Sequence, residues 1–161
     1  GIEPSTRAYN AAFLVNPDGR VIGKYHKRRL VMFGEYIPFG RWLPFLQRLA
    51  PIGDGFHPGA KPVPFRMDSL NVTTSVLICF EDNFPQEARD HATAALDFLV
   101  NLTNNAWFGE SSAQWQHAAN AVFRAIETGI PLVRSCNNGI SCWIDARGRM
   151  HSARLAEGRN V

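Results

Sequence analysis

The sequence predicts a layered α/β fold built as one domain over residues 1–161. Strand-like and helix-like segments alternate along the chain, which is the pattern of such a fold. Apolar residues make up 45% of the chain and charged residues 19%, so we expect a packed core and no extensive disorder. Within Gln114–Thr128, apolar residues recur at spacings of three and four, as on the packed face of a helix.

The N-terminal part is expected to form a hairpin followed by long loops. Ala11–Val15 and Arg20–Tyr25 predict two strands, because the turn Asn16-Pro17-Asp18-Gly19 lies between them. Residues 26–40 are typical of a loop and residues 41–50 of a short helix. The Gly- and Pro-rich residues 51–64 predict an extended loop.

The middle of the chain is expected to alternate buried strands with a helix. Asn71–Cys79 and Leu96–Leu102 are rich in apolar and β-branched residues, and each predicts a buried strand. A helix is expected from Phe84 onward, with Pro85 in its first turn, where a missing backbone N–H costs nothing. Residues 104–112 predict a polar loop.

The C-terminal part is expected to add one helix and short strands. The helix Gln114–Thr128 is predicted to end at Gly129 and Pro131. Strands are expected at residues 132–135 and 140–144, and again after the turn at residues 145–148. The packed face of the helix is predicted to carry Trp115, Ala118, Ala119, Val122 and Ile126.

Charge and hydropathy exclude several classes of function. The net charge is +3, too small an excess to indicate a nucleic-acid partner. No apolar run approaches the roughly 18 residues that a membrane-spanning helix needs, and no signal peptide begins the chain. We therefore expect the chain itself to be soluble and any membrane anchor to lie outside it.

The cysteines and histidines do not suggest a disulfide framework or a metal site. The chain has three cysteines, and Cys136 and Cys142 are either a bridged pair or two small core residues on strands. No Cys or His residues have the close spacing of a zinc site, so no metal and no cofactor is expected. A papain-like Cys–His enzyme is disfavoured because none of the five histidines has a local signature. His117 is expected to be packed or capping.

Four residues are candidates for chemistry. Cys79 ends a predicted buried strand just before a helix, where backbone N–H groups lower a thiol's pKa and bind an oxyanion; the alternative is a structural buried cysteine. Lys27, in a basic loop, either stabilises a thiolate and an oxyanion or belongs to a solvated patch. Glu35, among aromatic neighbours, is a base, an orienting partner of Lys27 or a surface residue. Glu81 has the same ambiguity.

Four blocks of sequence resemble the apolipoprotein N-acyltransferases, the membrane-bound branch of the nitrilase superfamily. The resemblance runs from about Tyr9 to Leu155 and keeps the order of the blocks. The first block, Tyr25-His26-Lys27 with Leu30-Val31 and Phe33-Gly34-Glu35-Tyr36-Ile37-Pro38, is similar to the family's lysine loop. The second, Ile78-Cys79-Phe80-Glu81, is similar to its nucleophile motif. The others are Asn101 to Gly109, and Gln116-His117 with Arg124 to Glu127, Pro131 to Arg134 and Asn137 to Ile140.

The resemblance implies a nitrilase-like α-β-β-α sandwich and a Glu–Lys–Cys catalytic set. It implies that Cys79 is the nucleophile, Lys27 its charged partner, and Glu35 and Glu81 further site residues, with the backbone N–H of Phe80 in the oxyanion hole. The implied reaction moves an acyl chain from a phospholipid, through a thioester, to the N-terminal amine of an apolipoprotein. The implied location is the periplasmic face of a bacterial inner membrane. The residues expected to face lipid are Phe39, Trp42, Phe45 and Trp107.

The chain departs from the family pattern in three ways. Phe80 replaces the usual Tyr, and Met32 replaces the usual Pro before the Phe-Gly-Glu run. The family's general-base Glu lies upstream of this chain, and Glu3 has no matching motif, so the chain is expected to be a truncated domain that is inactive alone. Two alternatives remain: a soluble amidase or nitrilase using the same Cys and Lys, and a non-catalytic module that keeps the fold for binding.

Overall fold

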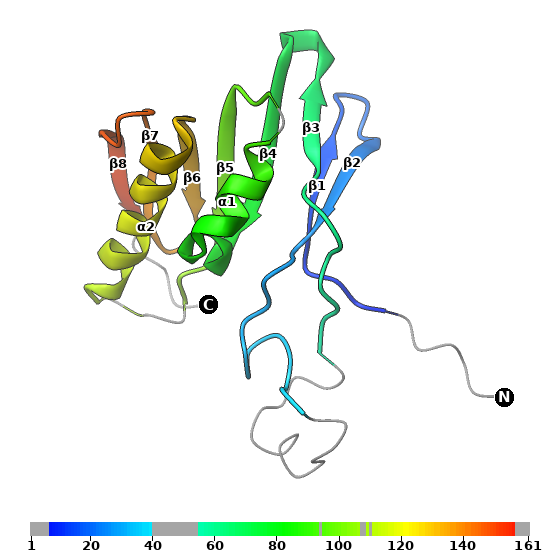
Figure 1. Ribbon diagram of the computed structural model, residues 1–161, viewed down its shortest axis with the longest axis vertical. Coiled ribbons are helices and arrows are strands. Elements are labelled where there is room, and N and C mark those ends of the chain that lie inside the picture. The colour runs from blue at the N-terminus through cyan, green and yellow to red at the C-terminus, as the bar shows by residue number, and fades with distance from the viewer. Residues whose placement is uncertain (1–6, 40–54, 94, 107–108, 110, 157–161) are drawn as a thin grey trace, which may run out of the picture.

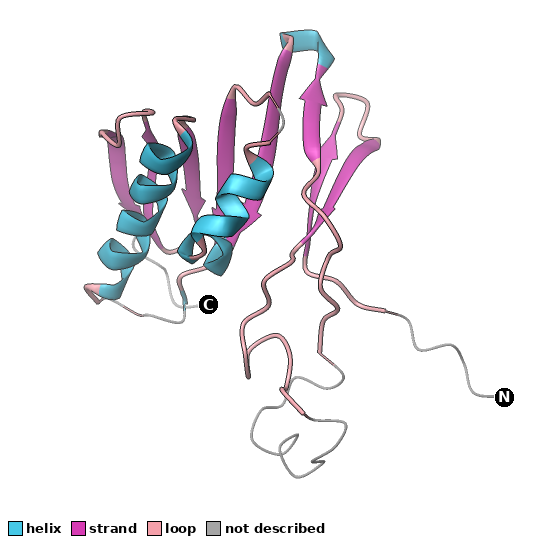
Figure 2. Ribbon diagram, in the orientation of Figure 1, coloured by secondary structure: helices cyan, strands magenta, loops and turns pink. Residues whose placement is uncertain are grey.

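The computed structural model describes residues 7–39, 55–93, 95–106, 109 and 111–156. Its centre is a six-stranded mixed sheet in the order β3-β4-β5-β6-β7-β8 (Figures 1 and 2). Strands β4, β5 and β6 run parallel, and the other neighbours are antiparallel. The strands are β3 (Pro64–Met67), β4 (Val72–Ile78), β5 (Phe98–Thr103), β6 (Leu132–Cys136), β7 (Gly139–Ile144) and β8 (Met150–Ala156).

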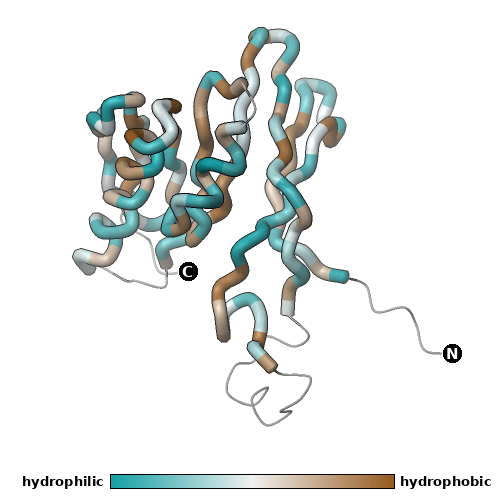
Figure 3. The backbone as a smooth tube through the Cα atoms, viewed as in Figure 1, coloured by the Kyte–Doolittle hydropathy of each residue, from teal (hydrophilic) through white to brown (hydrophobic). Residues whose placement is uncertain are grey.

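Two helices, α1 (Pro85–His91) and α2 (Ala113–Thr128), cover one face of the sheet (Figure 1). Helix α1 begins at Pro85 as expected, and α2 ends at Gly129, which adopts the left-handed conformation. Figure 3 shows hydrophobic residues gathering along the central strands. The core between α2 and the sheet consists of Leu99, Ala118, Ala121, Ala125, Leu132, Ile140, Cys142 and Ile144.

The predicted packed face of α2 is only partly correct. Ala118 is buried and Val122 partly buried, but Trp115, Ala119 and Ile126 are exposed. Small side chains let the helix lie close to the sheet, and polar side chains such as Arg124 share the buried face because they have partners inside the protein. Apolar residues therefore occupy two faces of α2: the small alanines pack against the sheet, and the larger Trp115 and Ile126 lie on the exposed face.

The hairpin of β1 (Ala11–Val15) and β2 (Val21–His26) forms a separate two-stranded sheet, as its turn predicted. A second apolar cluster joins this hairpin to β3 and β4. Its buried members are Ala12, Tyr25, Phe65, Val76 and Ile78. The cluster fixes the end of β2, and so the start of the loop that follows, against the end of β4.

One strand, β3, lies where the sequence analysis predicted none: Pro64 fell at the end of the predicted loop 51–64, and residues 65–67 were assigned to no element. β3 begins at Pro64 and pairs with β4 alone, so it is an edge strand, where a proline at the first position is tolerated. Phe65 is buried between exposed Pro64 and Arg66, which is the alternation of a half-buried strand. The predicted helix at residues 41–50 lies outside the described residues. Among those described, no helix is both long enough and apolar enough to cross a membrane.

Candidate active site

Cys79 lies at the junction between strand β4 and the turn that precedes α1. The strand ends at Ile78, and Cys79–Asn83 forms a short 3₁₀ helix that leads into α1 at Pro85. The φ angle of Cys79 is 51°, in the left-handed region. Its thiol is partly exposed and lies 3.8 Å from the carbonyl oxygen of Asn104. The predicted strand-to-helix junction is therefore confirmed, and it turns the thiol out of the sheet.

Lys27 follows directly after β2 and is held by Glu35. Its side chain is 1% exposed, and Nζ lies 2.7 Å from Oε2 of Glu35. The Glu35 carboxylate also accepts hydrogen bonds from the backbone N–H of Val31, at 2.8 Å, and from Asn10 Nδ2, at 2.6 Å. Lys27 is therefore not part of a solvated patch. Of the roles considered for Glu35, orientation of Lys27 is the one that these contacts favour.

Glu81 connects the segment that carries Lys27 to the segment that carries Cys79. Its Oε1 accepts hydrogen bonds from the Tyr25 hydroxyl at 2.9 Å and from the backbone N–H groups of Arg28 and Arg29 at 2.6 and 3.1 Å. Its Oε2 accepts one from the backbone N–H of Ile78 at 2.7 Å. Glu81 thus contacts residues before and after Lys27, and it also contacts Ile78, which directly precedes Cys79. These hydrogen bonds hold the two segments together.

The surroundings of Glu81 act on its pKa in opposite directions. Its carboxyl is fully buried, and this burial raises its pKa, while the hydrogen bonds from Ile78, Arg28, Arg29 and Tyr25 oppose the rise. Burial and the Glu81 carboxylate raise the pKa of Tyr25 far above its ordinary value, so the Tyr25 hydroxyl keeps its proton and donates it in the hydrogen bond. With both oxygens engaged, Glu81 is placed to position its neighbours.

Two arginines fix the lysine-bearing loop to helix α1. Arg28 Nη1 lies 3.0 Å from Oε2 of Glu87, and Arg28 Nη2 lies 3.0 Å from Oδ2 of Asp90. Nε of Arg29 donates to Oε1 of Glu87 at 2.6 Å. Glu87 is fully buried at the start of α1. Each arginine charge therefore has a carboxylate partner on α1.

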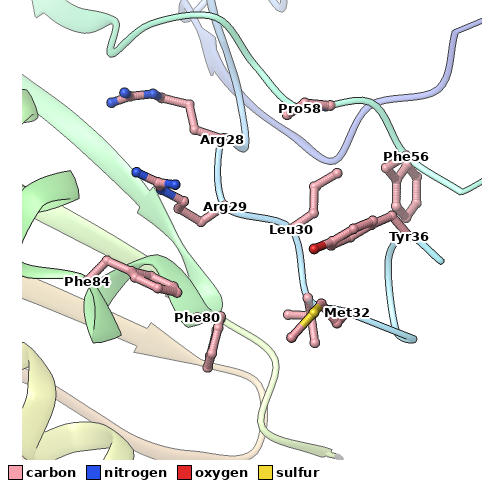
Figure 4. Close-up of a pocket in the computed structure, with 10 residues that line it drawn as sticks. Arg28, Arg29, Leu30, Met32, Tyr36, Phe56, Pro58, Phe80 and Phe84 are labelled. Atoms are coloured by element: carbon pink, nitrogen blue, oxygen red, sulfur yellow. The ribbon is translucent and has the colours of Figure 1, made fainter. Parts of the chain in front are cut away.

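A cavity of about 550 Å³ opens between this loop and the turn after Cys79 (Figure 4). Phe80 and Phe84 form one side, and Tyr36 and Phe56 lie across from them (Figure 4). Most of the wall is apolar, with the two arginines at one end. The lining residues are Arg28, Arg29, Leu30, Val31, Met32, Tyr36, Phe56, Pro58, Phe80 and Phe84.

Of the residues predicted to face lipid, the structure describes only Phe39. Phe39 is 74% exposed, so it does not belong to the core of the described residues. Trp42, Phe45 and Trp107 lie outside the described part of the chain. Their proposed contact with lipid stays a prediction.

A buried polar network lies behind Cys79. Asp82 is fully buried and accepts hydrogen bonds from Arg134 Nη1 at 2.6 Å and from His117 Nε2 at 2.8 Å. Arg134 Nη1 also lies 2.7 Å from Oδ1 of Asn101, whose amide group contacts the carbonyl of Cys79. His117 is packed, as expected. Asp82, Asn101 and Arg134 were not predicted as site residues, although an arginine inside an apolar strand indicates a buried partner, because arginine is almost never fully buried unpaired.

In the part of the chain that the structure describes, the cysteines and acidic side chains form no further centre. Cys79, Cys136 and Cys142 are free thiols, and the last two are buried on strands, which decides between the two interpretations in favour of core residues. Burial raises the pKa of both Cys136 and Cys142, as expected of structural cysteines. Among the residues that the structure describes, no group of three or more His, Cys, Asp or Glu side chains is arranged to hold a metal ion.

Comparison with known proteins places this arrangement among its relatives. The model of the family described as carbon-nitrogen hydrolase matches residues 3–160. The chain is 48% identical over 142 residues to an apolipoprotein N-acyltransferase of Geobacter metallireducens, covering 88% of this chain and 27% of that protein. It is 38% identical over 154 residues to an apolipoprotein N-acyltransferase of Rhizobium rhizogenes, covering 94% and 28%. The chain thus spans little more than a quarter of these relatives.

Solved structures agree on the fold. A mutant of the Nesterenkonia AN1 amidase from the nitrilase superfamily superimposes with a TM-score of 0.65 at 20% sequence identity, covering 91% of this chain and 51% of that one. Another structure of an amidase from Nesterenkonia sp. gives a TM-score of 0.63, also at 20% identity, covering the same 91% and 51%. The expected nitrilase-like α/β fold is confirmed.

Proposed function

Because the chain belongs to the carbon-nitrogen hydrolase family, we propose that it is the catalytic part of an N-acyltransferase in which Cys79 is the nucleophile. One observation carries the proposal: the Glu81 carboxylate accepts backbone hydrogen bonds from both segments, from Ile78 before Cys79 and from Arg28 after Lys27. The segments that carry Cys79 and Lys27 are therefore held side by side at an apolar cavity. The names of the aligned relatives favour acyl transfer over amide hydrolysis.

The proposed reaction has two acyl-transfer steps. A carboxylate base from outside this chain takes the proton of Cys79, and the thiolate attacks an ester carbonyl of a phospholipid. The S–C bond forms, the ester C–O bond breaks, and the departing alkoxide takes up the proton. The α-amine of an apolipoprotein's N-terminal cysteine then attacks the thioester. The C–N bond forms, the C–S bond breaks, and a proton from the amine passes to the Cys79 sulfur, which restores the thiol.

The described residues have distinct roles in this proposal. Lys27, oriented by Glu35, and the backbone N–H of Phe80 stabilise the oxyanion in both steps; a donor of this kind contributes roughly 100- to 1000-fold in rate. The apolar cavity beside Phe80 receives the acyl chain. Glu81 acts as a positioning residue through its contacts with both segments. Phospholipid and apolipoprotein are the proposed partners, at the periplasmic face of a bacterial inner membrane.

The experiment that tests this function measures acylation of Cys79. The longest polypeptide that carries this chain is incubated at neutral pH with vesicles of a phospholipid bearing an alkyne-tagged acyl chain. We expect a hydroxylamine-sensitive label on the Cys79 peptide, and none in Cys79→Ser. Cys142→Ser is the matched control, because it removes a buried thiol that lies on strand β7 in the core, and it should label as the parent does.

Two results would contradict the proposal. No label on Cys79 in the folded parent would exclude a thioester enzyme and favour a binding module. Rapid turnover of short-chain amides, with no transfer of the tagged chain to an amine acceptor, would favour a hydrolase.

A further inference from the structure

Asn101 occupies a central position beneath the catalytic turn. It lies on β5, fully buried, and its Nδ2 donates to the carbonyl oxygen of Cys79 at 3.2 Å and lies 3.5 Å from that of Leu77. Its Oδ1 accepts hydrogen bonds from Arg134 Nη1 at 2.7 Å and from Thr103 Oγ1 at 2.8 Å. A guanidinium can only donate and a carbonyl can only accept, so the network fixes which way the Asn101 amide points.

The residue that Asn101 contacts has an unusual backbone. Cys79 has a φ of 51°, a conformation that non-glycine residues rarely adopt and that persists only where the surrounding structure enforces it. The carbonyl of Cys79 shares a planar trans peptide bond with the N–H of Phe80, so the two point in opposite directions. A donor that draws the carbonyl toward the sheet therefore turns this N–H away from the sheet.

We propose that Asn101 is a positioning residue that sets the direction of the Phe80 N–H, and so of the oxyanion donor, by holding the carbonyl of Cys79. The inference rests on the proposed role of Cys79 as nucleophile. Arg134, held in turn by Asp82, and Thr103 orient the amide. Asn101 itself touches neither the thiol sulfur nor the cavity wall in the contacts described, and it acts through the peptide bond.

Two measurements on the same protein separate positioning from folding. Acylation of Cys79 by the tagged phospholipid needs the oxyanion donor, whereas alkylation of Cys79 by iodoacetamide forms no oxyanion. The variants are Asn101→Ala, and Asn101→Asp, which keeps the volume but replaces the donor with an acceptor. We expect kcat for acylation to fall about 10- to 100-fold with KM unchanged, and alkylation per folded molecule to change less than about threefold.

Thr74→Val is the matched control. Thr74 is a buried residue on β4 whose hydroxyl donates to a backbone carbonyl, that of Phe98, but it does not contact the catalytic turn. This variant should acylate at the parental rate per folded molecule. Parental acylation in both Asn101 variants would overturn the inference, and so would equal losses in the two assays. An unlabelled parent would instead contradict the proposed function, so the two failures are distinguishable.

Discussion

The ion pair formed by Lys27 and Glu35 predicts a strong energetic coupling within the loop that carries Lys27. The perturbation is Lys27→Met and Glu35→Gln, made singly and together. The two charges lie 2.7 Å apart, and their side chains are 1% and 13% exposed. Neither charge is well hydrated, so each depends on the other for compensation.

The magnitude follows from what each variant leaves behind. Removing one partner of a buried ion pair typically costs about 3–5 kcal/mol, because the remaining charge is uncompensated. We take about 3 kcal/mol for each single variant, since Glu35 also accepts hydrogen bonds from Val31 and Asn10 and is not fully buried. The double variant leaves no such charge. It should lose much less than the sum, which gives a coupling energy of about 2–3 kcal/mol.

The assay is urea unfolding followed by far-UV circular dichroism, with a double-mutant cycle calculated from the four free energies of unfolding. The control cycle uses Arg66 and Asp68, whose side chains are 51% and 92% exposed and whose charges lie 3.3 Å apart. Because solvent screens this surface pair, its coupling should be close to zero. Additive losses at Lys27 and Glu35, within about 0.5 kcal/mol, would refute the reasoning.

Three further predictions concern His91, Asp82 and Gly59. Burial lowers the pKa of His91 to about 4, so between about pH 6.5 and 4 the unfolded chain binds the proton and the native state does not. The free energy of unfolding should therefore fall by roughly 3 kcal/mol as pH drops through this window. In urea unfolding, His91→Gln should lack this part of the pH dependence of stability, and an unchanged pH dependence would contradict the prediction. Asp82→Asn should lower stability by about 3 kcal/mol in the same assay, because Arg134 keeps its buried charge without a carboxylate; a loss below about 1 kcal/mol would argue against that ion pair. Gly59→Ala should lower the thermal midpoint markedly, because its Cβ would collide with the backbone carbonyl of His26; Gly19→Ala, which meets open space, should cost only the strain of its positive φ, and equal shifts would count against the close approach.

The elements that sequence predicted correctly are those fixed by local chemistry. The hairpin follows from the Pro-Asp-Gly turn between two apolar segments, and the start of α1 follows from Pro85. The packed face of α2 was predicted from large apolar residues, and that rule failed at Trp115 and Ile126. What buries a helix face is the fit to the sheet, and alanines with an internally paired arginine fit more closely than tryptophan does.

The contacts that define the candidate site could not be predicted because their partners are distant in sequence. Glu81 was recognisable as an acid beside a candidate nucleophile, but not as a residue that binds Tyr25, Arg28 and Arg29, more than 50 positions away. A sequence motif gives the residue type at a position, whereas the role depends on which donors the fold brings to it. These three donors and the backbone N–H of Ile78 converge on one buried carboxylate. The positions of Lys27 and Cys79 therefore depend on the same group. A change at Glu81 should therefore disturb both, which a free catalytic acid would not do.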